Sequence, residues 1–129
     1  MNAPPAIASI ATISQQFATH AVNTPYSAIP ADMIDAAKLF LLDTLAVAWA
    51  GSDAPGCEAV YKILAEEGGR GDATAWVYGG KLPVAAAAYI NGMSSAALDY
   101  DALGRESPIH VAITVFPAAL AMAERQHAS

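Results

Sequence analysis

Clusters of basic residues are absent from this chain of 129 residues. It has six Lys and Arg against twelve Asp and Glu, and its formal net charge is −6. Lys81, Arg105 and Arg125 stand alone in the sequence. Nucleic acids and anionic membrane surfaces bind proteins through clustered positive charge. The sequence therefore argues against both as partners.

Cysteine and long apolar runs are equally scarce. Cys57 has no second cysteine to pair with, which fits a reducing compartment. Residues 1–14 lack the basic residues and continuous apolar core of a secretory signal. The longest apolar runs are interrupted, for example by Asp43 and by Pro117, and fall short of the roughly 20 residues that span a membrane. We therefore expect a soluble, cytoplasmic protein.

Aromatic residues make up 8% of the chain, although 55% of it is hydrophobic, and alanine supplies much of that apolar content. Alanine is the best helix former, and its small side chain lets helices approach closely. The sequence therefore predicts an all-α fold. We expect one domain over residues 1–129, built as an Ala-rich bundle of five or six helices.

The spacing of apolar residues and the positions of Gly and Pro locate these helices. A short β-prone connector is expected at 73–78, and Asp53 is a candidate cap for the helix that Gly68 ends. The predicted helices cover residues 5–20, 31–50, about 53–67, 83–100 and 109–126.

Two of these helices are unusually apolar. Apolar residues cover nearly every face of helix 31–50, which is typical of a buried helix, and helix 109–126 is nearly as apolar. A domain of this size can hardly cover two such helices. We therefore expect a homo-oligomer or a tight complex with a complementary subunit.

Asp99, Asp101 and His110 form the most informative polar cluster, because two acids and a histidine lie between two apolar segments. Asp99 could act as a general base on a carbon acid, and His110 as a proton donor or a ligand for a substrate carboxylate. The alternative is that the acids are solvated loop residues and that His110 is an ordinary residue at a helix start. Residues two apart on a helix point to roughly opposite sides. The two carboxylates can therefore pair only if the helix has already ended.

Other polar residues carry less functional signal. His20 and His127 are read as surface residues, and Asp43 as a structural residue with a hydrogen-bond partner. The histidines are far apart in sequence and Cys57 has no partner, so we expect no metal site. Residues 68–72 lack the Gly-Lys-Ser/Thr ending of a phosphate loop, and no organic cofactor is implied.

Four blocks of sequence occur in a recognisable order. They are residues 37–51, which include Leu41-Leu42-Asp43-Thr44; residues 75–83, with Ala75-Trp76-Val77-Tyr78-Gly79-Gly80; residues 86–101, with Asn91-Gly92 and Leu98-Asp99-Tyr100-Asp101; and residues 110–124, with His110 and Pro117. In this combination the chain resembles the 2-methylcitrate dehydratase (MmgE/PrpD) family over about residues 5–126.

The resemblance implies the first part of the helical domain of a longer, two-domain protein. Family members include dehydratases, a decarboxylase and an epimerase that act on small di- and tricarboxylates. Asp99 falls on the family's acidic position, and His110 on the histidine that opens its following helix. The resemblance therefore makes Asp99 and His110 catalytic candidates, and it assigns no substrate-binding residue.

Three departures from the family pattern limit this reading. Ala96 and Ala102 stand where the family usually has histidine and a second aspartate, and Val111-Ala112 replace a Pro-Ser pair. The family's other catalytic residues lie downstream of Ser129, so we expect at most half a site in this chain. The leading hypothesis is a piece or subunit of a hydro-lyase or isomerase of this type, inactive alone. The alternative is a non-catalytic helical assembly module derived from the same family.

Overall fold

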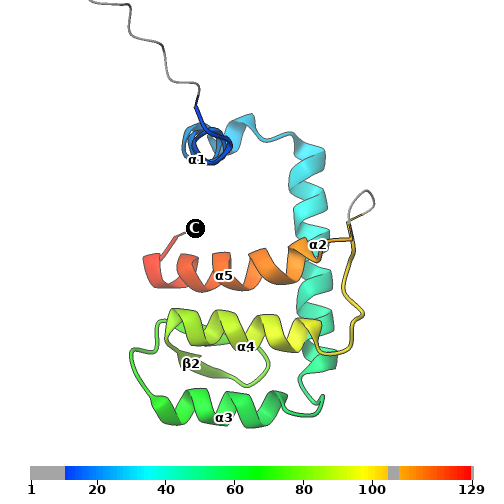
Figure 1. Ribbon diagram of the computed structural model, residues 1–129, viewed down its shortest axis with the longest axis vertical. Helices are drawn as coiled ribbons and strands as arrows, with labels where there is room; N and C mark the ends of the chain where they lie inside the picture. The colour runs from blue at the N-terminus through cyan, green and yellow to red at the C-terminus, as the bar shows by residue number, and fades with distance from the viewer. Residues whose placement is uncertain (1–10, 105–107, 129) are drawn as a thin grey trace, which may run out of the picture. The chain divides into compact units, whose positions relative to one another are not determined.

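A computed structural model describes residues 11–104 and 108–128. Its contacts divide the chain into two units, Met1–Asp35 and Ala36–Ser129. The described residues form five α-helices, one short 3-10 helix and a two-stranded sheet (Figure 1). This confirms the predicted all-helical class, with the addition of a small hairpin.

The first unit contains helix α1 (Ile13–Asn23), the 3-10 helix η1 (Tyr26–Ala28) and the start of α2 (Ala31–Gly51). Thr12 caps α1 through a capping box, because its hydroxyl accepts the Gln15 N–H at 3.3 Å and the Gln15 side chain accepts the Thr12 N–H at 2.8 Å. No side chain of α1 is buried. The helix begins later than the predicted range 5–20, whose residues before 11 lie outside the described part.

The second unit continues α2 and adds α3 (Cys57–Glu67), β1 (Ala73–Ala75), β2 (Gly80–Leu82), α4 (Val84–Ala96) and α5 (Val111–Gln126). The predicted cap at Asp53 is wrong. Gly56 precedes α3 with φ of +96°, a conformation that glycine adopts without steric cost. The residues before it form a turn, so the helix begins only at Cys57.

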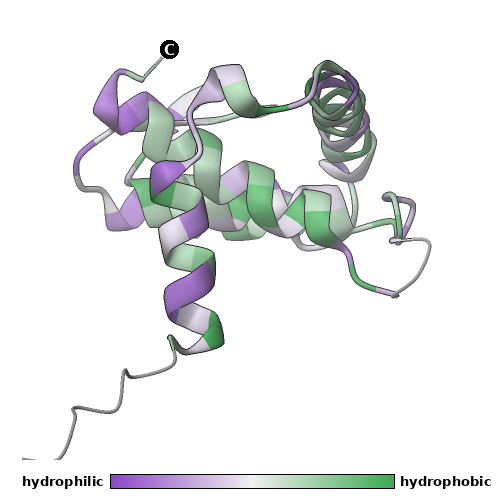
Figure 2. Cartoon of the chain, turned by 90° about the horizontal axis from the view of Figure 1, so that it is seen from above, coloured by the Kyte–Doolittle hydropathy of each residue, from purple (hydrophilic) through white to green (hydrophobic). Residues whose placement is uncertain are grey.

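The core lies where α4 and α5 cover the hairpin. Strands β1 and β2 pair antiparallel, with Ala73 opposite Leu82 and Ala75 opposite Gly80. Hydrophobic residues predominate along α4 and α5 (Figure 2). The core cluster consists of Ala73, Ala75, Leu82, Ala87, Ile90 and Ala121. Most of its side chains are small, so these elements pack closely.

Asn91 fixes α4 against the hairpin. Its side-chain amide donates to the Thr74 carbonyl and its amide oxygen accepts the Trp76 N–H, each at 2.9 Å. Asn91 is buried, and so these two bonds satisfy polar groups at the edge of β1. The neighbouring Gly92 faces α5, and a Cβ added there would make an ordinary contact of 3.4 Å with the Ile113 carbonyl oxygen. The Asn-Gly pair is thus a helical packing feature, as the alanine-rich flanks predicted.

Helix α2 is not the buried helix that its sequence predicts. Its buried residues are Thr44, Val47, Ala48 and Gly51, a narrow stripe of mostly small side chains. The stripe meets the C-terminal end of α4, where Gly51 lies against the Ser94 backbone. The described neighbours cover this stripe and leave large apolar side chains exposed, namely Leu39, Phe40, Leu42, Leu45 and Trp49.

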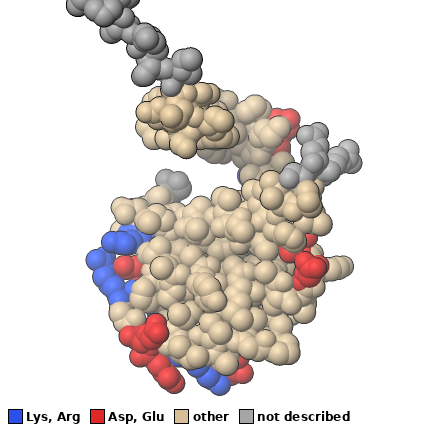
Figure 3. Space-filling model, in the orientation of Figure 1, with Lys and Arg blue, Asp and Glu red and all other residues tan. Residues whose placement is uncertain are grey.

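The surface carries few charges, and most of the face in Figure 3 is formed by uncharged residues. Within residues 11–104 and 108–128, none of the helices combines the length and the apolar character needed to cross a membrane.

Candidate functional site

The candidate site lies where the chain leaves α4 and enters α5. Helix α4 ends at Ala96, several residues before the predicted end near Tyr100. The Asp99 N–H donates to the Ala96 carbonyl at 3.0 Å, and Asp99 itself takes a left-handed conformation with φ of +50°. Aspartate tolerates this conformation better than most residues. Because of this turn, the chain at Asp101 no longer follows the direction of α4.

This early helix end brings the two carboxylates together. One ligand atom from each of Asp99, Asp101 and His110 lies within 4.8 Å of the others. On a continuing helix Asp99 and Asp101 would point to roughly opposite sides. Because the helix ends before Asp99, the turn at Asp99 allows the two carboxylates to lie in one site.

His110 enters the site from the other side as the residue preceding α5. Its side chain makes no capping bond to the helix, and its backbone carbonyl instead accepts the Thr114 hydroxyl at 2.9 Å. The imidazole Nδ1 lies 2.7 Å from Asp101 Oδ2. The His110 side chain is 38% exposed and the Asp101 side chain 1% exposed. Asp101 is therefore the inner member of the pair and His110 the outer one.

The three residues differ in their environments. Asp99 is exposed, so its carboxylate can reach a molecule in solution. Asp101 Oδ1 is buried and has no hydrogen-bond partner among the described residues. The other oxygen, Asp101 Oδ2, is hydrogen-bonded to His110. The site thus offers an exposed acid and a partly exposed histidine, with a buried acid behind the histidine.

Asp101 was not among the predicted catalytic residues, whereas Asp99 and His110 were. The signal for it was present, since Asp101 follows Asp99 at a spacing of two and precedes His110 by nine. This spacing brings Asp101 to the site only if the helix ends before Asp99. The sequence instead predicted a helix that continued to about Tyr100.

The expectation that no metal site exists rested on the distance between the histidines in sequence. The fold instead groups one histidine with two carboxylates, and these are donor types that divalent metals accept. Sequence separation of the histidines is therefore no argument against a metal here.

Asp43 differs from expectation in its hydrogen bonding. The sequence predicts a partner for it, but Oδ2 is buried with none among the residues that the structure describes. His20 and His127 are exposed, as predicted.

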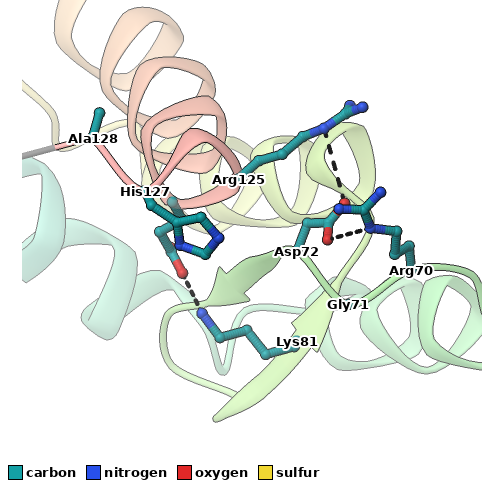
Figure 4. A pocket seen from close by; sticks show the side chains of 8 residues that line it. Arg70, Gly71, Asp72, Lys81, Arg125, His127 and Ala128 are labelled. Atoms are coloured by element: carbon teal, nitrogen blue, oxygen red, sulfur yellow. Dashed lines mark hydrogen bonds and ion pairs between the residues drawn. The ribbon is translucent and has the colours of Figure 1, made fainter.

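A second polar cluster lines a pocket at the end of α5 (Figure 4). Lys81 pairs with Glu124, while Arg70 and Arg125 both approach Asp72, at 2.8 and 4.0 Å. The resemblance gives these cations no role, and their partners are carboxylates of this chain. We therefore read this cluster as a structural link between α5 and the hairpin.

Glu124 is the centre of that link. It accepts the Thr74 N–H at 3.1 Å, the Thr74 hydroxyl at 2.6 Å and the Lys81 ammonium. Burial by itself would raise the pKa of Glu124, but the hydrogen bonds from Lys81 and Thr74 outweigh it and hold the pKa below its ordinary value. The carboxylate is therefore well adapted to its charged form.

Comparisons with known proteins point to one family. The model of the MmgE/PrpD N-terminal domain matches residues 15–129. A cis-aconitate decarboxylase of Aspergillus terreus is 31% identical over 112 residues, which cover 87% of this chain and 23% of that protein. A second A. terreus cis-aconitate decarboxylase, from strain NIH 2624, is 34% identical over 104 residues, covering 81% and 21%.

The cis-aconitate decarboxylase-like protein oryM of Aspergillus oryzae is 34% identical over 100 residues, covering 78% of this chain and 21% of that protein. The chain thus spans less than a quarter of the length of these curated relatives. No solved structure matches it.

Proposed function

The chain belongs to the MmgE/PrpD family, and from that premise we propose that it forms the N-terminal part of a lyase acting on a small di- or tricarboxylate. The observation that carries the proposal is the grouping of Asp99 and His110 at one end of α4 and α5. The names of the curated relatives support a carboxylate substrate such as cis-aconitate.

The proposed chemistry begins at a carbon next to a carboxylate. Asp99, as the exposed acid, takes the role of base or orienting group, and His110 protonates a leaving group or binds a substrate carboxylate. Such a reaction also needs cationic groups that hold the substrate's carboxylates. Among the residues that the structure describes, Arg70 and Lys81 are ion-paired away from this site. We propose that residues outside this chain contribute to holding the substrate's carboxylates.

Turnover measurements test this assignment. We expect no measurable activity of the isolated chain on 2-methylcitrate, citrate or cis-aconitate. The assembled protein, purified from its native source under mild conditions, should convert at least one of them. In that assembly Asp99→Asn and His110→Ala should each lower kcat by about 10²-fold or more, the scale of a lost acid or base.

The matched control is His20→Ala, which removes an exposed imidazole of α1 and should leave turnover unchanged. Robust activity of the chain alone would show that the site needs no further residues. Full activity of both site variants in the assembly would show that Asp99 and His110 are ordinary loop residues.

We further propose that another chain, a second copy or a complementary subunit, covers α2. The specific observation is that Leu39, Leu42 and Trp49 are each about two-thirds or more exposed. Contiguous exposed apolar side chains favour association. This feature also fits the alternative function, a non-catalytic assembly module.

Sedimentation tests the assembly. The chain should sediment as an oligomer or co-purify with a partner, and replacing Leu42 and Trp49 with serine should weaken the association. Val115→Ser on α5, which removes one exposed apolar side chain from a different helix, is the control. A compact monomer at micromolar concentration, recovered without any partner, would refute the proposal.

A further inference from the structure

We propose that Asp101 is a positioning residue that holds His110 in the tautomer with the proton on Nδ1, so that Nε2 is the atom that exchanges protons with substrate. This inference rests on the proposed function for its catalytic meaning. Its structural content, the state of the His110 ring, can be measured without turnover.

The first argument is the geometry of the pair. Asp101 Oδ2 lies 2.7 Å from His110 Nδ1, a distance typical of a strong, charge-assisted hydrogen bond. An ionised carboxylate can only accept, and so the Nδ1–H must donate. In a neutral imidazole one nitrogen carries the proton and the other a lone pair. The bond therefore leaves the lone pair on Nε2, so Nε2 is the nitrogen that must first take up a proton before His110 can donate that proton to a leaving group.

The second argument is the difference in burial across the pair. The Asp101 side chain is 1% exposed, and its Oδ1 has no partner in the described part of the chain. Burying a carboxylate costs free energy unless it is paired, and the hydrogen bond to His110 provides that pairing for Asp101. A buried acid behind an accessible imidazole is an arrangement that orients the ring and stabilises its charged form.

The third argument is the position of Asp99. Its carboxylate lies on the exposed side of the same cluster, within 4.8 Å of ligand atoms of the other two residues. A substrate that reaches Asp99 therefore also reaches the exposed part of His110. Asp99 and His110 can share the chemistry, while Asp101 stays out of contact with the substrate and acts through the ring.

The experiment measures the ring nitrogen shifts of His110 by ¹⁵N NMR on the full chain, in alkaline buffer containing a chelator. The His110→Gln variant assigns the signals, and His20 and His127 serve as internal references. We expect a protonated Nδ1 in His110, which is the reverse of the tautomer that neutral histidine favours in water. Asp101→Leu, which cannot accept a hydrogen bond, should abolish this preference.

Asp99→Asn is the matched control, because asparagine also tolerates the left-handed turn, removes the charge of the neighbouring carboxylate and should leave the His110 tautomer unchanged. If Asp101→Leu fails to fold, the unmodified chain alone decides the question. A proton on Nε2 of its His110 would overturn the proposal, and so would a shift typical of nitrogen bound to a metal.

Kinetics of the assembled enzyme then connects the tautomer to catalysis. Asp101→Leu should lower kcat by about 10²-fold or more, with a smaller change in KM, because the ring is misoriented and substrate binding is retained. An altered tautomer with unchanged kcat would overturn the positioning role. An assembly without activity on any substrate would count against the proposed function, while the tautomer result would still stand.

Discussion

Gly51 of α2 lies directly against the backbone of α4, and its replacement tests how the two helices are held together. A Cβ added at Gly51 would lie 2.1 Å from the Ser94 carbonyl oxygen and 3.2 Å from the Ala97 Cβ. Ordinary contacts of a Cβ begin at 3.4 Å. The Ser94 oxygen belongs to the helix backbone, so it cannot rotate away. Gly51→Ala must therefore separate α2 from α4 or bend one of them.

The expected cost follows from this overlap. Overpacking a close contact typically destabilises a protein by about 1–3 kcal/mol. Alanine also favours a helix over glycine by up to about 1 kcal/mol, which reduces the net effect, although Gly51 is the last residue of α2. We expect a net destabilisation of about 1–2 kcal/mol, or a fall in Tm of roughly 3–12 °C for a chain of this length.

Gly92→Ala is the matched control, because it makes the same substitution in the interior of α4. Its added Cβ would lie 3.4 Å from the Ile113 carbonyl oxygen, an ordinary contact. This variant should be as stable as the unmodified chain or more stable, since it gains helix propensity. Urea unfolding followed by circular dichroism measures both variants. Equal stability of Gly51→Ala and Gly92→Ala would refute the close packing of α2 on α4.

Two further predictions concern the core and the link to the hairpin. Ile90→Ala should cost about 2–5 kcal/mol in urea unfolding because Ile90 is fully buried, while Ile63→Ala, at a position 56% exposed, should cost far less; equal losses would place Ile90 outside the core. Because hydrogen bonds from Lys81 and Thr74 lower the pKa of Glu124, its contribution to stability is present above its ordinary pKa of 4.5 and disappears as the pH falls through the lowered value. The stability difference between the unmodified chain and Glu124→Gln should therefore shrink in acid, and a difference that grows toward low pH would contradict this sign.

The local sequence was sufficient for much of the helical framework. Helix periodicity and alanine content predicted α2 and α5 almost to the residue, and Gly68 was correctly read as the end of α3. These features depend on interactions within a few residues of the chain. The family could also be identified from the sequence, because ordered motifs need no knowledge of contacts.

Contacts between distant residues decided the rest. Asp99 and His110 were candidates from the sequence, but the early end of α4 and the left-handed turn at Asp99 were needed to reveal Asp101 behind His110. The exposure of α2 was equally hidden, because periodicity reports how apolar a helix is and says nothing about what covers it. Sequence pattern therefore determined the elements and the candidates, and tertiary packing determined which side chains meet, which are buried and which remain available to a partner.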